Sequence, residues 1–171
     1  MLRVPVDNPT LRRTLRPLYA QHQATPWGGF LDPTYDPATD PEIYPGTVMK
    51  RADLGTARDG GEVWKPYDGT GEPVGLSALF MAPSMGVNEV TASGTNLFTI
   101  WVGGSDAVFE ILSPAFDPTG LNTAEAGAYL TGNSDGLLTV TGATNANSIA
   151  QLVEVVSDAK IIVRLHRKVT A

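Results

Sequence analysis

Residues 149–169 read IAQLVEVVSDAKIIVRLHRKV, and this stretch predicts the fold more clearly than any other part of the chain. Two strand-like runs, Ile149–Val156 and Lys160–Val169, are separated by Ser157–Asp158, a pair that favours a turn. Successive side chains of a strand point to opposite faces, so the second run has one apolar and one mixed face. These faces carry Ile161, Val163 and Leu165, and Ile162, Arg164 and His166, respectively.

Similar short runs occur upstream, and combinations of Gly, Asn, Asp and Ser lie between most of them. The runs are Thr47–Lys50, Glu62–Lys65, Val74–Phe80, Leu97–Val102, Ala107–Leu112 and Leu137–Thr141. Short strands at this spacing favour a compact antiparallel β-sandwich or barrel, so the fold class is predicted to be mainly β. One short helix is expected over Thr123–Leu130, where three alanines and a glutamate favour it.

The composition agrees with a β-rich chain. Hydrophobic residues make up 42% of the 171 residues, enough for a core, whereas charged residues make up only 18%, against roughly 25% in an ordinary soluble domain. Glycine and proline are in excess, with 18 and 13 residues. These values disfavour a helical bundle, a coiled coil and a Rossmann-type enzyme.

Proline concentrates in the first part of the chain. Eight of the 13 prolines lie at or before Pro45, and the last four of these recur at every fourth position, beginning with Pro33. Prolines disrupt regular ladders of backbone hydrogen bonds, so residues 1–45 are expected to be extended or rich in turns. A flexible linker would be poor in aromatic residues, but this segment contains Trp27, Phe30, Tyr35 and Tyr44.

We therefore interpret residues 1–45 as an arm that lies on a surface, either that of this protein or that of a partner, and favour the partner. Residues 46–171 form the predicted β-rich body, with residues 121–171 either part of the same fold or an added subdomain. Within the arm, Asn8–Arg16 predicts a short helix, because Asn8 can cap it and Pro9 suits its first position. Its apolar face would carry Leu11, Leu15 and Leu18.

Charge is divided unevenly along the chain. The formal net charge is −6, and the body between residues 52 and 155 carries most of the acidic groups, so DNA or RNA is a poor match as a partner. Arg12, Arg13 and Arg16 are interpreted as a solvated helix face. No run of apolar residues suggests a signal peptide or a membrane span, so we expect a soluble protein without a membrane partner.

No pattern of catalytic or cofactor-binding residues is evident. The chain has no cysteine and only two histidines, His22 and His166, and the latter is expected at a surface or interface. The glycine-rich run 68–75 lacks the spacing of a dinucleotide-binding loop and the alternating oxygen ligands of a calcium loop. We therefore expect no cofactor, no metal, no small-molecule substrate and no enzymatic activity.

The run 68–79, DGTGEPVGLSAL, resembles an element of the lambda-type head decoration proteins, which stabilise the capsids of tailed bacteriophages. The resemblance rests on the Asp68–Gly69 turn followed by Val74, Gly75 and Leu76. An N-terminal arm, a β-rich body low in charge and the absence of cysteine are also similar.

The resemblance implies a β-tulip-like body and a homotrimer on the outside of the mature head, at three-fold and quasi-three-fold positions, after assembly in the host cytoplasm. It also implies that the arm contacts the major capsid protein, commonly by extending one of its sheets. Leu2, Val4 and Val6 alternate with other residues at the period of two that a half-buried strand requires. Three arms would bind with strong avidity.

Two other functions compete with capsid decoration. One is a tail, neck or fibre-base component of the virion with a β-sandwich body. The other is a carbohydrate-binding β-module, in which Trp27 or Trp64 would stack on a sugar. An enzyme of unknown type is the least favoured reading.

Overall fold

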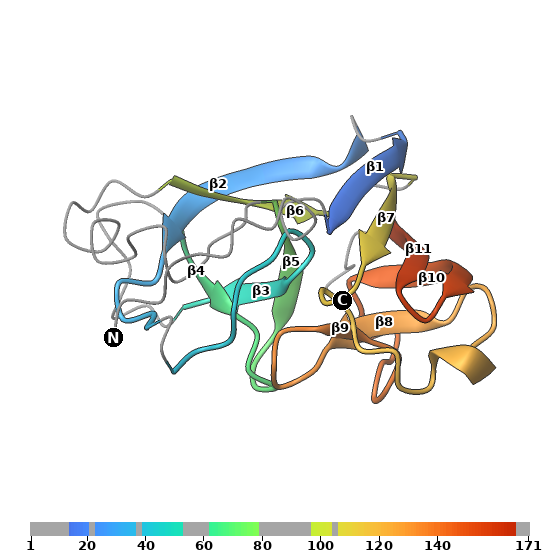
Figure 1. Cartoon of the computed structure of the whole chain (residues 1–171). Helices are drawn as coiled ribbons and strands as arrows, with labels where there is room; N and C mark the ends of the chain where they lie inside the picture. The colour runs from blue at the N-terminus through green and yellow to red at the C-terminus, as the bar shows by residue number, and fades with distance from the viewer. Residues whose placement is uncertain are drawn as a thin grey trace.

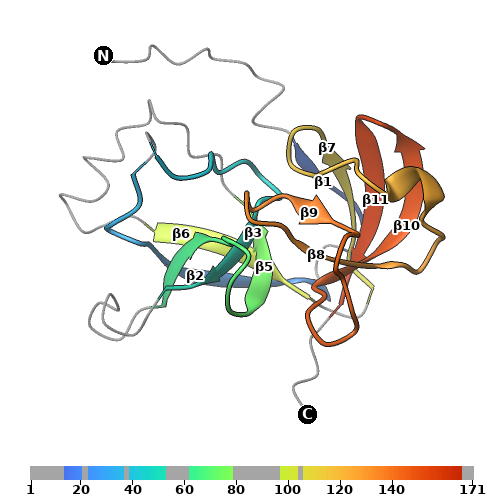
Figure 2. The same cartoon turned by 90° about the horizontal axis from the view of Figure 1, so that it is seen from below.

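The computed structural model describes residues 14–20, 23–36, 39–52, 62–78, 97–103 and 106–166. These residues form two β-structures that lie side by side, a closed five-stranded barrel and a six-stranded antiparallel sheet (Figure 1). Figure 2 shows the same pair turned by 90°, with β8 and β9 of the sheet next to β3 and β5 of the barrel. The prediction of a mainly β fold is therefore confirmed.

The sheet and the barrel together contain eleven strands among the described residues. In spatial order, the sheet consists of β1 (Leu15–Tyr19), β7 (Val108–Leu112), β11 (Lys160–Leu165), β10 (Ala150–Ser157), β8 (Tyr129–Gly132) and β9 (Leu138–Thr139). The barrel consists of β2 (Thr25–Leu31), β4 (Val63–Pro66), β3 (Val48–Arg51), β5 (Pro73–Ser77) and β6 (Leu97–Val102). Its single parallel pair is β2 with β4.

The hairpin of β10 and β11 has the two faces that its sequence predicts. Ile161, Val163 and Leu165 are buried, whereas Arg164 is exposed. Two register shifts, between Leu152 and Glu154 and between Val155 and Ser157, bend β10 against its partner. All eight predicted strands are present, although several are shorter than expected.

The two predicted helices are not formed where the structure describes those residues. Leu15 and Arg16 lie in strand β1, and residues 8–13 lie outside the described residues. At the start of the second segment, Thr123 ends one turn of 3-10 helix, Leu121–Thr123 (η4), and residues 124–130 form no helix. Gly127 has a φ of +90° and donates its N–H to the Leu152 carbonyl, so pairing with β10 overrides the local helix preference of the alanines.

One two-stranded ribbon passes through both β-structures. In the barrel, β2 pairs antiparallel with β6, and Thr25 lies opposite Val102. In the sheet, β1 pairs antiparallel with β7, and Tyr19 lies opposite Val108. Five residues separate the two pairs on each strand of the ribbon, so the register is conserved across the bend. The same two chain segments therefore pair with each other in the barrel and again in the sheet, in one continuous register.

The barrel and the sheet also share a hydrophobic core. One buried cluster fills the barrel and contains Ile43, Met49, Trp64, Phe98 and Ile100, together with Leu31 and Tyr35. A second cluster contains the inner face of the sheet and extends to the barrel residues Val48, Tyr67 and Leu76. The segment after residue 120 completes the six-stranded sheet with β1 and β7, so it belongs to the same core.

The proline-rich segment folds onto the body of its own chain, in contrast to the expectation that it lies on a partner. The Asp32 carboxylate accepts hydrogen bonds from the N–H and hydroxyl of Thr34, at 2.9 and 2.8 Å. The Tyr35 hydroxyl donates to the Pro41 carbonyl at 2.8 Å, and Ile43 is fully buried. Side chains and isolated backbone groups thus replace the ladder that proline excludes.

Gly132 permits a close approach between the sheet and the barrel. A Cβ atom at this position would lie 2.5 Å from Tyr67 Cδ1 and 2.9 Å from Val48 Cγ1. The next turn adds a backbone contact, because the Val48 N–H donates to the Gly136 carbonyl at 2.8 Å. Any side chain at residue 132 must therefore displace the barrel.

We predict that Gly132→Ala lowers the free energy of unfolding by about 1–3 kcal/mol, the usual cost of overpacking a core. Urea denaturation followed by tryptophan fluorescence measures this change. Gly28→Ala is the matched control, since a Cβ there meets nothing within 4 Å, and it should change stability by less than about 0.5 kcal/mol. Equal effects of the two substitutions would contradict the close approach at Gly132.

Candidate interaction surface

Strand β1 lies at one end of the six-stranded sheet, and β7 is its one strand partner among the described residues. An edge strand offers backbone groups to a further strand. Four of its five residues are exposed, including the apolar Leu18 and Tyr19, of which 45% and 69% of the surface is exposed. The third exposed large apolar residue in the described structure, Val156, lies on β10.

A β-bulge lies within this exposed part of β1. Pro17 lies opposite Phe109 and Tyr19 lies opposite Val108, so Leu18 is the extra residue. Bulges and prolines at sheet edges limit uncontrolled pairing between molecules. The edge is therefore open over a short length only, next to two exposed apolar side chains.

Glu110 fixes β1 to the sheet by binding two cations. Its side chain, on β7, is 9% exposed. Oε1 lies 2.9 Å from Arg16 Nη2 on β1, and Oε2 lies 3.2 Å from Lys160 Nζ on β11. Three neighbouring strands are thus joined on one face. Arg16 acts here as a cross-strand partner and not as part of a helix face, while Arg12 and Arg13 lie outside the described residues.

The run that resembles the phage decoration proteins forms the loop between β4 and β5 and strand β5 itself. Lys50, on β3 and almost completely buried, donates hydrogen bonds to Asp68 Oδ1 at 2.5 Å and to both Thr70 oxygens at 3.0 Å. Asp68 Oδ1 also accepts from the Thr70 N–H and hydroxyl. Partial burial opposes ionisation of Asp68, but the hydrogen bonds from Lys50 and Thr70 outweigh it and hold the pKa of this carboxyl well below its usual range.

The remaining residues of this run have structural roles. Gly69 has a φ of +85° in the loop. A Cβ on Gly75 would collide with the Trp101 carbonyl oxygen of β6, so the barrel closes only with glycine here. Leu76 is fully buried and Val74 is half-buried. Residues 68–76 therefore stabilise the closed barrel.

The two tryptophans proposed for sugar stacking are occupied within the protein. Trp64 is fully buried. Trp27 packs edge-on against it, with ring centroids 5.3 Å apart, and the Arg51 guanidinium lies 4.8 Å from the Trp27 ring centroid. Arg51 also pairs with Glu62 at 3.1 Å. Trp64 offers no face to a sugar, and a sugar on Trp27 would have to displace Arg51.

Ten residues were predicted to contact a capsid, and the six of them that the structure describes differ in exposure. Leu2, Val4, Val6 and Leu11 lie outside the described residues. Tyr35 is buried in the barrel. Leu15, Trp27 and Tyr44 are half-buried against the core of the same chain, and Phe30 is half-buried. Leu18 is the one exposed member among the described residues, and Tyr19, which the sequence analysis did not select, is more exposed than Leu18.

The described residues contain no group of three or more potential metal ligands, and none of their helices is long and apolar enough to cross a membrane. His166 is half-buried; its Nε2 lies 2.8 Å from Ser148 Oγ, and its ring packs edge-on against Tyr129. Because Ser148 is fully buried, this pair fastens the end of β11 to the preceding loop.

The barrel, the sheet and the short exposed edge define a mainly β protein. A search of curated proteins found no match. The model of the phage cement protein family matches residues 1–171, and the chain belongs to this family. It is thus a non-enzymatic protein that decorates the phage capsid and is part of the virion.

We predict that Asp68→Asn destabilises the protein at neutral pH by about 1 kcal/mol, because buried Lys50 loses its charged partner while Asp68 itself is half exposed. The lowered pKa means that the ionised form of Asp68 stabilises the fold above pH ~4. This contribution is lost as the pH falls further, so the difference between wild type and variant should narrow from pH 5 to pH 2.

Urea denaturation at several pH values measures this difference. Asp158→Asn, in the exposed turn between β10 and β11, is the control and should not reproduce the pH dependence. A constant difference between wild type and Asp68→Asn from pH 7 to pH 2 would contradict the role given to the Lys50–Asp68 pair.

Proposed function

We propose that this cement protein binds the outside of the mature head through residues 1–13 and the edge of β1, with the major capsid protein as its partner. In this proposal it binds as trimers at three-fold and quasi-three-fold positions. There it would hold neighbouring capsomers together against the pressure of the packaged DNA.

The observation that carries the proposal is the position of β1. Residues 1–13 lead directly into the edge strand of the sheet, beside exposed Leu18 and Tyr19. A strand from a partner can pair with such an edge through main-chain hydrogen bonds, while neighbouring apolar pockets give specificity. The alternation of Leu2, Val4 and Val6 suits a strand added to a sheet of the capsid protein.

The shared core supports a mechanical role. The ribbon of β1 and β2 with β6 and β7 runs through both β-structures, and Glu110 joins β1 to β7 and β11. A load applied to residues 1–13 would therefore pass into the sheet and the barrel together. Three such attachments per trimer would turn modest individual affinities into strong avidity.

We predict that Leu18→Ser with Tyr19→Ser weakens binding to expanded shells at least about tenfold, since the lost apolar burial is worth about 1–3 kcal/mol per molecule. Co-sedimentation with shells measures the affinity. Val156→Ser removes a similarly exposed apolar side chain from β10 and should leave binding unchanged. If the double variant bound shells as wild type does, the β1 edge would not be part of the contact.

The proposed stoichiometry has a separate test. Cryo-electron microscopy of decorated heads should show three copies around each three-fold and quasi-three-fold position, and decorated shells should survive heating better than bare shells. Density at the neck, the tail or a fibre base in place of these positions would contradict the proposed location.

A further inference from the structure

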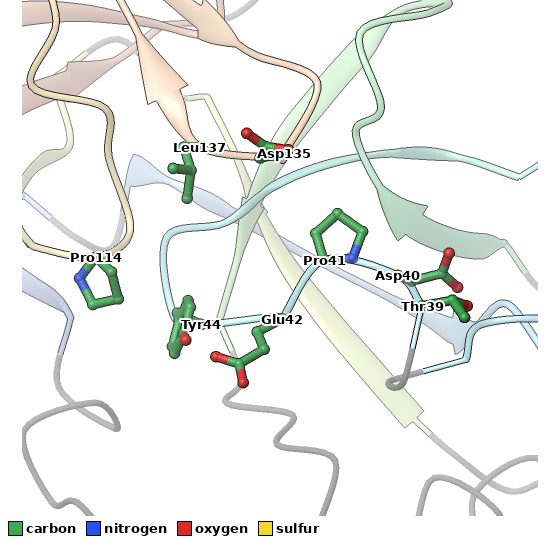
Figure 3. Close-up of a pocket in the computed structure, with 8 residues that line it drawn as sticks. All are labelled: Thr39, Asp40, Pro41, Glu42, Tyr44, Pro114, Asp135 and Leu137. Carbon is green, nitrogen blue, oxygen red and sulfur yellow. The ribbon is translucent and has the colours of Figure 1, made fainter.

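An open groove lies on the side of the barrel that faces the turns of the sheet, with a volume of about 410 Å³. Figure 3 shows residues 39–44 along one side of it, and Pro114 and the turn between β8 and β9 on the other. Pro41, Tyr44, Pro114 and Leu137 supply an apolar lining. An extended peptide with apolar side chains would fit such a surface.

Three carboxylates also line the groove and give it negative charge. They belong to Asp40, Glu42 and Asp135, all of them exposed residues. The pKa of Tyr35 reflects part of this charge. Burial raises its pKa above its usual range, and the negative charges of Asp40, Glu42 and Asp36 raise it further. The ligand of the groove should therefore be cationic as well as apolar.

Four of the six lysine and arginine side chains in the described part of the chain form ion pairs outside the groove. These pairs join Arg16 and Lys160 to Glu110, Lys50 to Asp68, and Arg51 to Glu62. A cationic segment that enters the described structure beside the groove is therefore a candidate ligand.

The chain enters the described structure beside this groove. Thr14, the first described residue, donates its hydroxyl to the Pro45 carbonyl at 2.6 Å, and its own carbonyl accepts from the Leu112 N–H at 2.7 Å. Pro45 follows Tyr44 directly, and Leu112 precedes Pro114 by two positions. The two hydrogen-bond partners of Thr14, Pro45 and Leu112, therefore lie within two positions of residues that line the groove.

We infer that the groove binds residues 1–13 of its own chain when the protein is free. This segment carries Arg3, Arg12 and Arg13 against a single acidic residue, Asp7, so its charge is opposite to that of the groove. Arg12 and Arg13 lie within two residues of Thr14, which places their Cα atoms within about 7 Å of the Thr14 Cα. The segment thus combines the cationic side chains of Arg12 and Arg13 with the apolar side chain of Leu11, which matches the charge and the lining of the groove.

The inference concerns the free protein and does not depend on the proposed contact with the capsid. It assigns a ligand to the groove, namely a basic and apolar peptide, and it commits to an intramolecular complex. Short sequence separation favours this, because the two parts share a high effective concentration. A second copy could supply the same segment, and the experiment below distinguishes the two.

Trypsin cleavage of the full chain after Arg12 and Arg13 tests the inference, with the released peptides measured by mass spectrometry. A groove variant combines Asp40→Asn, Glu42→Gln and Asp135→Asn. The control variant combines Glu125→Gln, Glu154→Gln and Asp158→Asn, which change the net charge equally at exposed positions outside the groove. We expect cleavage of the groove variant to be at least about five times faster, and that of the control variant to stay within twofold of wild type.

The salt dependence of cleavage is a second test, made on the wild-type protein. Because exposed ion pairs are screened at high ionic strength, 0.5 M NaCl should raise the wild-type cleavage rate, relative to the groove variant in the same buffer, until the two agree. Cleavage of the groove variant at the wild-type or control rate would overturn the inference. Protection that increases with protein concentration over a hundredfold range would overturn its intramolecular form.

Discussion

The constraint on which the rest of the structure depends is the register of one antiparallel ribbon across the bend between barrel and sheet. Thr25 pairs with Val102 in the barrel, and Tyr19 pairs with Val108 in the sheet, so β1 and β2 follow one register with β7 and β6. Buried Ala24 and Ala107 lie at this bend, where larger side chains would have little room. The barrel and the sheet therefore act as one unit, and the segment that precedes β1 is attached to all of it.

This arrangement changes the size of the predicted arm. Proline and aromatic content indicated an arm of 45 residues, but residues 14–20, 23–36 and 39–45 pack on the body of the same chain. The aromatic side chains that argued for a partner surface, Tyr35 above all, fill the barrel. In the proposed attachment, the segment that contacts the capsid is therefore residues 1–13, shorter than the 45 residues expected from composition.

The sequence predicted the strands whose alternation or apolar runs are local, such as β6 and β11, and it missed those whose pairing is tertiary. Pro17 in β1 and Pro26 with two glycines in β2 are residues that disfavour strands, and β8 follows a run rich in alanine that favours a helix. Each becomes a strand because a distant partner supplies the ladder, which local propensity cannot show. The resemblance at Asp68–Leu76 predicted a capsid decoration protein, although the structural role of these residues is to stabilise the barrel. The exposed edge was not predictable, because β1 and its bulge depend on pairing with β7.

The central proposal is that residues 1–13 and the edge of β1 attach the protein to the head. Hydrogen–deuterium exchange, compared between the free protein and the protein bound to expanded shells, tests this claim directly, since added strand pairing protects backbone amides. We expect shell binding to protect the backbone amides of residues 1–13 and Leu15–Tyr19 from exchange. Exchange in β10 and in the loop between β4 and β5 should change little. New protection in β8, β9 or the barrel, with none in residues 1–19, would contradict the proposal.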